Sequence, residues 1–254
     1  MYQSDPETLA ARLWSEARAG LSLLSRLPLP PPAHFPTPPA VWAWPVAGLV
    51  LGVLTSLGAG LGVWLGLPSG LAAALFLGLG SLMTGALHED GLADSCDGLW
   101  GGWTRERRLE IMKDSHIGSY GVMGLLLVTL ARWSAVAELI SAGAWGALIA
   151  AAVLSRAPMA VLITALPNAR GSGLSQSVGR PDAMAAAAAT LVALGLALAL
   201  TGLSGLMMAF WVTGAVWALA MLARRKIGGQ TGDILGASQQ LGDLAALAAA
   251  CALL

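Results

Sequence analysis

Long apolar stretches follow one another from Val46 onward, and they constrain the fold of this chain more than any other feature. A helix needs about 20 apolar residues to cross the ~30 Å hydrocarbon core of a bilayer. We place membrane-spanning helices at 46–66, 71–87, 120–141, 144–166, 183–201 and 206–223. A last segment, 237–254, is shorter and carries Asp243, so the pattern leaves open whether it spans or re-enters. The chain is predicted to be all-α, a polytopic membrane helical bundle of about six to seven transmembrane helices.

The composition agrees with a bilayer as the main solvent. Of the 254 residues, 56% are hydrophobic and 11% are charged, whereas soluble domains carry about 25% charged residues. Positive and negative charges balance and occur in local clusters. This argues against nucleic acid as a partner, because nucleic acid is bound by a basic face. Cys96 and Cys251 have the spacing of neither a zinc site nor a disulfide framework.

The chain before the first span divides into two parts, which belong with the rest to a single integral membrane domain, 1–254. Residues 6–26 predict an amphipathic helix that lies in the membrane interface, with leucines on one side and charged residues elsewhere. Residues 27–45 form a Pro-rich link, and its prolines exclude a helix between Leu27 and Pro39. No cleavable signal peptide is expected at the N-terminus.

Charge separates the connecting loops into two groups. Apart from Arg132 and Arg156, all of the 14 basic residues lie in the N-terminal region or in the loops 88–119, 167–182 and 224–240. The turns that would face the other side are neutral. Under the positive-inside rule, the three charged loops face the cytoplasm of a plasma membrane, which in a bacterium is the inner membrane.

An acidic run after the second apolar stretch holds the most unusual side chains. It reads His88-Glu89-Asp90-Gly91-Leu92-Ala93-Asp94-Ser95-Cys96-Asp97-Gly98. On a helix, at about 100° per residue, the three aspartates spread over about 60° of one face. Like charges there repel one another, and Mg²⁺, or alternatively Mn²⁺, is the natural counter-ion because hard cations prefer carboxylate oxygens. The plainer alternative is a solvated helix end.

Two classes of function fit the charged loops. Glycines that let backbone amides approach an anion, arginines that bind phosphate and carboxylates that bind metal are typical of a phosphoryl-transfer site. The alternative is an ion transporter, which places its carboxylates near the bilayer midplane. Here the acids cluster at one cytoplasmic edge, among glycines and arginines. That placement favours a metal-dependent transferase that joins a hydroxyl group to an activated phosphate.

The motifs resemble those of the cobalamin synthase family, the adenosylcobinamide-GDP ribazoletransferases. The matches are the acidic run itself, Leu27-Pro28-Leu29-Pro30, Trp44-Pro45-Val46-Ala47-Gly48, Lys113-Asp114-Ser115…Ile117-Gly118-Ser119-Tyr120-Gly121 and Gly229-Gln230-Thr231-Gly232-Asp233…Gly236-Ala237. They occur in family order from about residue 25 to 245 and cover most of the chain. Asp243 stands where the family pattern leads us to expect Glu.

The resemblance implies a reaction and a role for each candidate residue. Adenosylcobinamide-GDP would be joined to α-ribazole or α-ribazole 5′-phosphate, giving adenosylcobalamin or its 5′-phosphate and GMP. Mg²⁺ would be held by Asp90, Asp94 and Asp97. The proton acceptor would be Asp114 or His116, with Glu89 as a third candidate. Arg156 and Arg170 would contact the substrate phosphates, and Asp233 is grouped with them as a cofactor-binding residue.

One related family stays open as an alternative. Asp94-x-x-Asp97-Gly98 is similar to the core of the CDP-alcohol phosphotransferase motif, but Gly101-Gly102 replaces the Ala-Arg pair that follows in that family.

Gly- and Ala-rich spans allow close helix packing, so a homo-oligomer is also possible.

Overall fold

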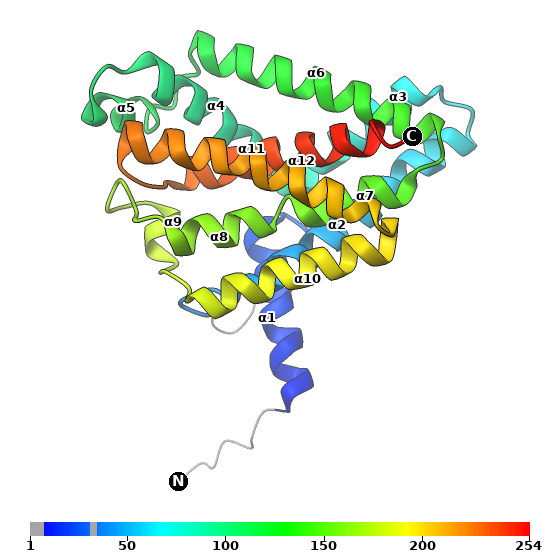
Figure 1. Ribbon diagram of the computed structural model, residues 1–254, viewed down its shortest axis with the longest axis horizontal. Coiled ribbons are helices and arrows are strands. Elements are labelled where there is room, and N and C mark those ends of the chain that lie inside the picture. The colour runs from blue at the N-terminus through cyan, green and yellow to red at the C-terminus, as the bar shows by residue number, and fades with distance from the viewer. Residues whose placement is uncertain (1–7, 31–34) are drawn as a thin grey trace.

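The computed structural model describes residues 8–30 and 35–254, and every regular element in that part of the chain is helical (Figure 1). The elements are α1 (Leu9–Leu24), the short 3₁₀ helix η1 (Val41–Ala43), α2 (Trp44–Trp64), α3 (Ser69–Thr84), α4 (Leu87–Gly101), α5 (Arg105–Ile111), α6 (Ser119–Ser141), α7 (Trp145–Leu154), α8 (Ala157–Ala165), α9 (Leu174–Ser177), α10 (Ala183–Thr201), α11 (Ser204–Ile227) and α12 (Gly232–Cys251).

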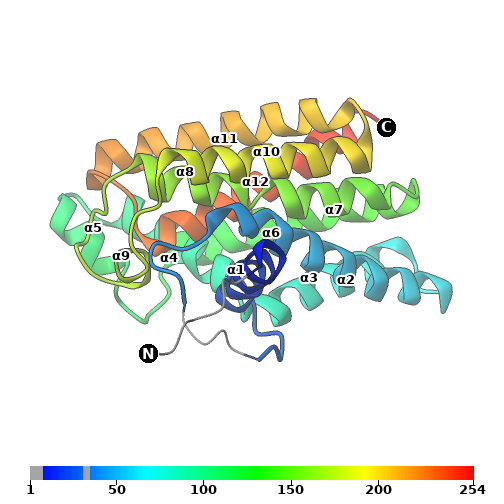
Figure 2. The same cartoon turned by 90° about the horizontal axis from the view of Figure 1, so that it is seen from below.

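Within the described residues, five helical segments are long and apolar enough to cross a membrane, or six if one bent pair counts as a span. They are Val41–Trp64, Ser119–Ser141, Trp145–Ala165, Ala183–Thr201 and Ser204–Ile227, with α3 and α4 as the bent pair. Figure 2 shows the long helices running side by side. The predicted polytopic membrane bundle is confirmed, and the protein is an integral membrane protein.

The predicted span 71–87 is wrong at its end, because the chain bends there by 90°. Gly85 and Ala86 both adopt left-handed backbone angles, with φ of 64° and 56°, and α4 leaves α3 at this break. Glycine adopts this conformation without strain, but an alanine in it costs about 1–2 kcal/mol. The expected loop 88–119 consequently begins with the regular helix α4, and α5 lies further along it.

The last helix, α12, lies at the centre of the bundle, and it is not one of the described segments that are long and apolar enough to count as a membrane span. α12 packs against α4, α6, α7, α8 and α11, and most of its side chains are buried (Figure 1). Buried polar side chains on α12, including Gln239, Gln240 and Asp243, explain its lower hydropathy. The surrounding helices, not lipid, form most of its environment, so α12 can carry polar groups that a lipid-facing helix could not.

A buried ion pair joins α6 to this central helix. The Arg132 guanidinium lies 2.9 Å from the Asp243 carboxylate and donates a 2.6 Å hydrogen bond to Gln240 Oε1. Glu89 lies 3.9 Å from Arg132 and accepts a hydrogen bond from Ser81. These contacts pair charges that would otherwise stand alone inside the apolar bundle.

Replacing Arg132 with Ala is expected to destabilise the protein by about 3–5 kcal/mol, because Asp243 would then be a buried charge without its partner. Thermal unfolding of the purified protein in detergent measures the loss. The double variant Arg132→Met/Asp243→Leu removes both charges and should recover most of the lost stability. A single variant as stable as the wild type would show that the pair is not needed to neutralise Asp243.

The amphipathic segment predicted at 6–26 is observed as α1, which projects from the bundle (Figures 1 and 2); residues 6 and 7 lie outside the described residues. Leu9, Leu13 and Trp14 are exposed on its outer half, whereas Ala19 and Leu24 are buried at its inner half. Apart from residues 31–34, which are not described, the Pro-rich link contains no helix before Val41, as predicted.

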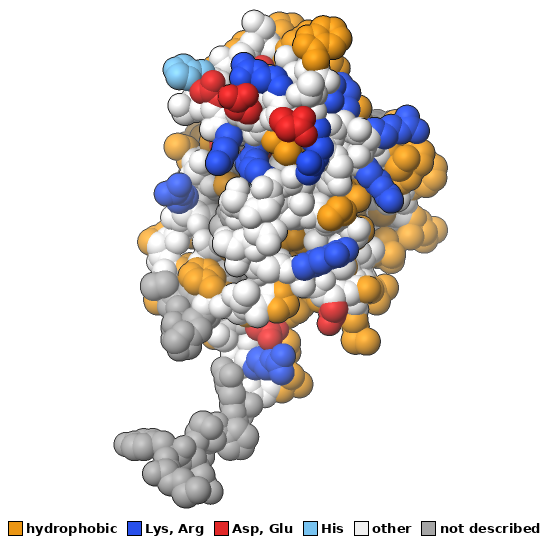
Figure 3. Space-filling model, turned by 90° about the vertical axis from the view of Figure 1, so that its left-hand side faces the viewer, with side chains coloured by type: hydrophobic (Ala, Val, Ile, Leu, Met, Phe, Trp, Pro, Cys, Tyr) orange, Lys and Arg blue, Asp and Glu red, His pale blue; other side chains and the backbone are white. Residues whose placement is uncertain are grey.

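The charged loops and the neutral turns lie at opposite ends of the bundle. The connections around α5, around α9 and between α11 and α12 meet at the left-hand end of Figure 1, and the turns α2–α3, α6–α7 and α10–α11 lie at the right-hand end. Lys, Arg, Asp and Glu side chains gather on the left-hand end (Figure 3). This separation agrees with the loop grouping predicted from charge.

Candidate active site

Two glycines let α4 and α12 cross in direct backbone contact. A Cβ added to Gly91 would lie 2.8 Å from the Asp233 carbonyl oxygen and 3.0 Å from Gly236 Cα. A Cβ added to Gly236 would lie 3.2 Å from Gly91 Cα. Any side chain would therefore separate the helices. We predicted that the loop glycines let backbone amides approach an anion. At this crossing, Gly91 and Gly236 instead bring the acids of α4 beside the first turn of α12.

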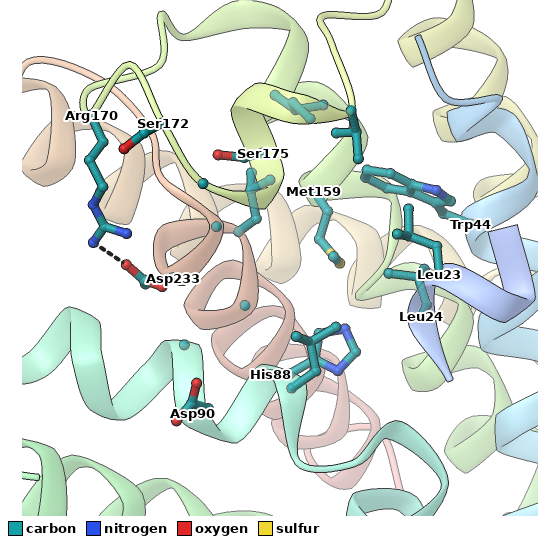
Figure 4. A pocket seen from close by; sticks show the side chains of 18 residues that line it. Leu23, Leu24, Trp44, His88, Asp90, Met159, Arg170, Ser172, Ser175 and Asp233 are labelled. Atoms are coloured by element: carbon teal, nitrogen blue, oxygen red, sulfur yellow. Dashed lines mark hydrogen bonds and ion pairs between the residues drawn. The ribbon is translucent and has the colours of Figure 1, made fainter. Parts of the chain in front are cut away.

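A cavity of about 160 Å³ lies beside this crossing (Figure 4). One part of its wall is polar and is formed by His88, Asp90, Arg170, Ser172, Ser175 and Asp233. Another part is apolar and is formed by Leu23, Leu24, Trp44, Met159, Ile163 and Val178. Segments far apart in the sequence (α1, α2, α4, α8, the loop after α8 and α12) thus contribute to one site.

Charged side chains lie close together in the polar part of the cavity wall. Arg170 Nη2 donates a 2.7 Å hydrogen bond to Asp233 Oδ2, drawn as a dashed line in Figure 4. Burial raises the pKa of Asp233, Arg170 opposes that rise, and the Asp90 carboxylate adds to it. The carboxylates of Asp233 and Asp90 also repel that of Asp94. The charges of three acids and one arginine therefore act on one another in this part of the molecule.

The loop that carries Arg170 is shaped by Asn168. Its Oδ1 accepts hydrogen bonds from the backbone N–H groups of Arg170 and Gly171, at 2.9 and 2.8 Å, and its Nδ2 donates to Ser175. The backbone of Gln230 pairs with this loop through the Ala169 N–H and the Pro167 carbonyl. The loop after α8 and the loop before α12 are thereby joined, which positions Arg170 opposite Asp233.

The three predicted metal ligands do not meet at one point. Asp97 is buried on another side of α4, where its carboxylate accepts hydrogen bonds from Gly118 N and Gly121 N at 2.7 and 2.9 Å. It therefore caps the first turn of α6, where helix amides lack backbone partners. Within residues 8–30 and 35–254, no group of three or more His, Cys, Asp or Glu side chains is arranged to hold a metal ion.

Replacing Asp97 with Asn is expected to lower stability by about 1.5–3 kcal/mol, because the amide has one oxygen and no charge with which to satisfy two N–H groups. Thermal unfolding in detergent provides the readout. Changing the exposed Glu110 to Gln is the matched control and should leave the unfolding temperature unchanged. Unchanged stability of the Asp97 variant would contradict the capping role.

The predicted proton acceptors Asp114 and His116 lie together but outside this cavity. They are exposed in the loop between α5 and α6, where His116 Nδ1 lies 2.7 Å from Asp114 Oδ1. Their hydrogen bond lowers the pKa of Asp114 and raises that of His116. Both line a separate, open depression that also contains Asp97.

Glu89 and Arg156 lie apart from the other candidates as well. They line a smaller cavity of about 40 Å³ inside the bundle, together with Arg132 and Asp243. Arg156 is buried and donates hydrogen bonds to the Ala152 carbonyl and to Ser155 Oγ. Of the predicted residues, only Asp90, Arg170 and Asp233 line the cavity at the α4–α12 crossing, and their charges also act on Asp94.

Two important glycines were not predicted to act as a helix-packing pair. Gly91 and Gly236 make the crossing of α4 and α12 possible, and each directly adjoins a helical turn that carries a site aspartate. The signal available in the sequence was that each glycine follows an aspartate of its motif closely, by one position for Gly91 and by three positions for Gly236. Close helix packing through small residues is the standard reading of such a pattern in membrane bundles.

The fold and the site together define the class of protein: an integral membrane protein with a carboxylate- and arginine-lined cavity near the charged end of a helical bundle. The chain belongs to the cobalamin-5-phosphate synthase family, whose sequence profile matches residues 16–251.

Curated relatives cover nearly the whole chain. An adenosylcobinamide-GDP ribazoletransferase of Bradyrhizobium diazoefficiens is 46% identical over 251 residues, which are 94% of this chain and 94% of the relative. A protein of the same name from Azorhizobium caulinodans is 43% identical, covering 93% of this chain and 95% of the relative. No solved structure gives a significant match to the chain.

Proposed function

We propose that this protein joins adenosylcobinamide-GDP to α-ribazole or α-ribazole 5′-phosphate and releases GMP. The observation that carries the proposal is the meeting of Asp90, Asp233 and Arg170 on one cavity, in a chain whose relatives bear the name of this transferase. The same family resemblance supports the products, adenosylcobalamin or its 5′-phosphate.

The reaction needs one bond to form and one to break. A ribose hydroxyl of the ribazole attacks the phosphorus attached to cobinamide, the P–O bond to GMP breaks, and the hydroxyl proton leaves to a base. Arg170 is placed to bind phosphate oxygens: it already pairs with Asp233, and its buried Nε has no hydrogen-bond partner among the described residues. A guanidinium with a free donor suits a diphosphate because it can form parallel hydrogen bonds to its oxygens.

Asp90 and Asp94 are the residues that would hold Mg²⁺ or Mn²⁺. Mg²⁺ is usually bound by one or two carboxylates and completes its coordination with water and substrate phosphates. Two repelling carboxylates beside a cavity fit that pattern without a third protein ligand. When bound, the ion supplies neutralisation of the diphosphate charge. Asp97, which caps α6, would support this pair by positioning α4 against α6.

The charged end of the bundle is proposed to face the cytoplasm of the bacterial inner membrane. The basic residues of the loops around α5 and α9 and after α11 support this orientation under the positive-inside rule. The homo-oligomer allowed by the small residues of the spans stays a prediction.

Turnover of the purified full chain in nanodiscs tests the proposal. With adenosylcobinamide-GDP, α-ribazole 5′-phosphate and Mg²⁺, we expect GMP and the joined corrinoid in equal amounts, and removal of divalent cations with EDTA should abolish both. Restoring Mg²⁺ should restore both. Folded protein that forms neither product, but transfers phosphoalcohol from a CDP-activated substrate, would contradict the proposal.

A further inference from the structure

The cavity at the α4–α12 crossing has an apolar wall to which the proposed reaction assigns no role. The wall is formed by Trp44 from α2, Met159 and Ile163 from α8, and Leu23 from α1 (Figure 4). These apolar side chains cannot bind phosphate, which is the role proposed for Arg170. Trp44 is 2% exposed and Ile163 is 1% exposed. Side chains of this kind bind the apolar portion of a ligand and exclude its charged portion.

A second hollow continues from this wall. It has a volume of about 300 Å³ and shares Leu23, Trp44 and Val178 with the first cavity. Its remaining lining comes from α1, the Pro-rich link and the end of α9 and is mostly apolar. Trp44 therefore stands between two hollows at the inner end of α1, with one of them reaching the carboxylates of α4 and α12.

The size and chemistry of the first cavity select one part of the proposed substrates. At about 160 Å³, it is smaller than the roughly 300–1,000 Å³ of pockets that enclose a whole drug-sized ligand, so a corrin ring does not fit. Guanine would leave its polar edges without partners against an apolar wall. The dimethylbenzimidazole base of α-ribazole is a flat bicyclic ring with two methyl groups and no exocyclic hydrogen-bonding groups, and it suits such a wall.

Trp44 offers two complementary features to such a base. Its indole ring lines the cavity and offers an aromatic base an edge contact. Its Nε1 is buried and lacks a hydrogen-bond partner among the described residues. A benzimidazole joined to ribose keeps one ring nitrogen as an in-plane acceptor, which could receive that N–H.

We propose that the apolar wall around Trp44, Met159 and Ile163 is the binding site for the benzimidazole base of the ribazole substrate. This inference rests on the proposed function. With the base against this wall, the ribose of the nucleoside points toward the polar part of the cavity, where Asp90, Asp233 and Arg170 lie. The wall thereby selects the attacking substrate by the chemistry of its base.

A matched pair of substitutions in α8 tests the assignment. Ile163 and Leu162 are neighbours and both are buried, but only Ile163 lines the cavity. In the full chain in nanodiscs, we expect Ile163→Ala to raise the Kd for α-ribazole, measured by calorimetry, about tenfold, equivalent to about 1.4 kcal/mol. Leu162→Ala should leave it unchanged, and neither variant should alter the Kd for adenosylcobinamide-GDP.

A second variant guards against a folding defect in the first. Trp44→Phe keeps an aromatic ring and removes the N–H, and it should raise the KM for α-ribazole 5′-phosphate several-fold while the KM for adenosylcobinamide-GDP stays unchanged. Binding of α-ribazole without any turnover would refute the proposed function and leave this assignment standing. Absence of α-ribazole binding by the wild type, or turnover with ribazole constants that neither variant changes selectively, would overturn the assignment.

Discussion

Replacing Asp94 with Asn is expected to lower kcat for GMP release by about 10²–10³-fold, the loss typical of removing one preorganised electrostatic group from an active site. Asn has nearly the same size as Asp but no charge, so the change tests the charge itself. Asp94 lies where the carboxylates of Asp90 and Asp233 act on it, and the proposed cation would be held by Asp90 and Asp94. Single-turnover assays with saturating Mg²⁺ measure the chemical step directly.

Asp182 provides the matched control for this substitution. It is an aspartate at the N-terminus of α10, where its carboxylate accepts a hydrogen bond from Ala185 N at 2.7 Å. Asn serves almost equally well at such a capping position, so Asp182→Asn should keep both wild-type turnover and stability. Wild-type turnover in folded Asp94→Asn protein would remove Asp94 from the site.

Replacing Gly91 with Ala should nearly abolish turnover and destabilise the protein by about 1–3 kcal/mol, as overpacking does. The new Cβ would lie 2.8 Å from the Asp233 carbonyl oxygen and 3.0 Å from Gly236 Cα, and these are backbone atoms of α12, which cannot move aside as a flexible side chain can. Separating α4 from α12 moves Asp90 away from Asp233. Turnover and the unfolding temperature are measured on the same preparation.

Gly195→Ala is the control for this change, because it makes the same substitution inside a helix with no heavy atom within 4 Å of the added Cβ. Alanine is favoured over glycine in a helix interior by about 0.5–1 kcal/mol, so this variant should be active and slightly more stable. Equal behaviour of the Gly91 and Gly195 variants would mean that the close crossing of α4 and α12 does not organise the site.

Hydropathy predicted the lipid-facing helices well, because it reports transfer into hydrocarbon. It could not predict α12 as the central helix, since Gln239, Gln240 and Asp243 lower the hydropathy of a segment that contacts protein on most sides. It also missed the bend at Gly85 and Ala86. Alanine normally favours a helix, but Ala86 adopts a left-handed conformation here, with its N–H donating to the Ser81 carbonyl in the turn that ends α3.

The site was predicted only in part, because its geometry also depends on how helices distant in the sequence pack together. The helical spacing of Asp90, Asp94 and Asp97 was read correctly as one helix, but α4 packs against α12 on one side and α6 on another. Asp97 faces the amides of α6, whereas Asp90 lines the same cavity as Asp233. Periodicity reports which residues share a helix face, whereas the neighbour of that face depends on segments distant in the sequence. Arg170 and Asp233 were predicted singly, and their pairing needed the structure.

The structure of the full chain with bound Mg²⁺ and adenosylcobinamide-GDP, determined by cryo-electron microscopy without the ribazole substrate, tests the central claim most directly. We expect the diphosphate beside Asp90 and Asp94, with Arg170 in contact with its oxygens and the cavity wall at Trp44 still free for the second substrate. A diphosphate bound in the depression beside Asp114 and His116, with the cavity at the α4–α12 crossing empty, would contradict it.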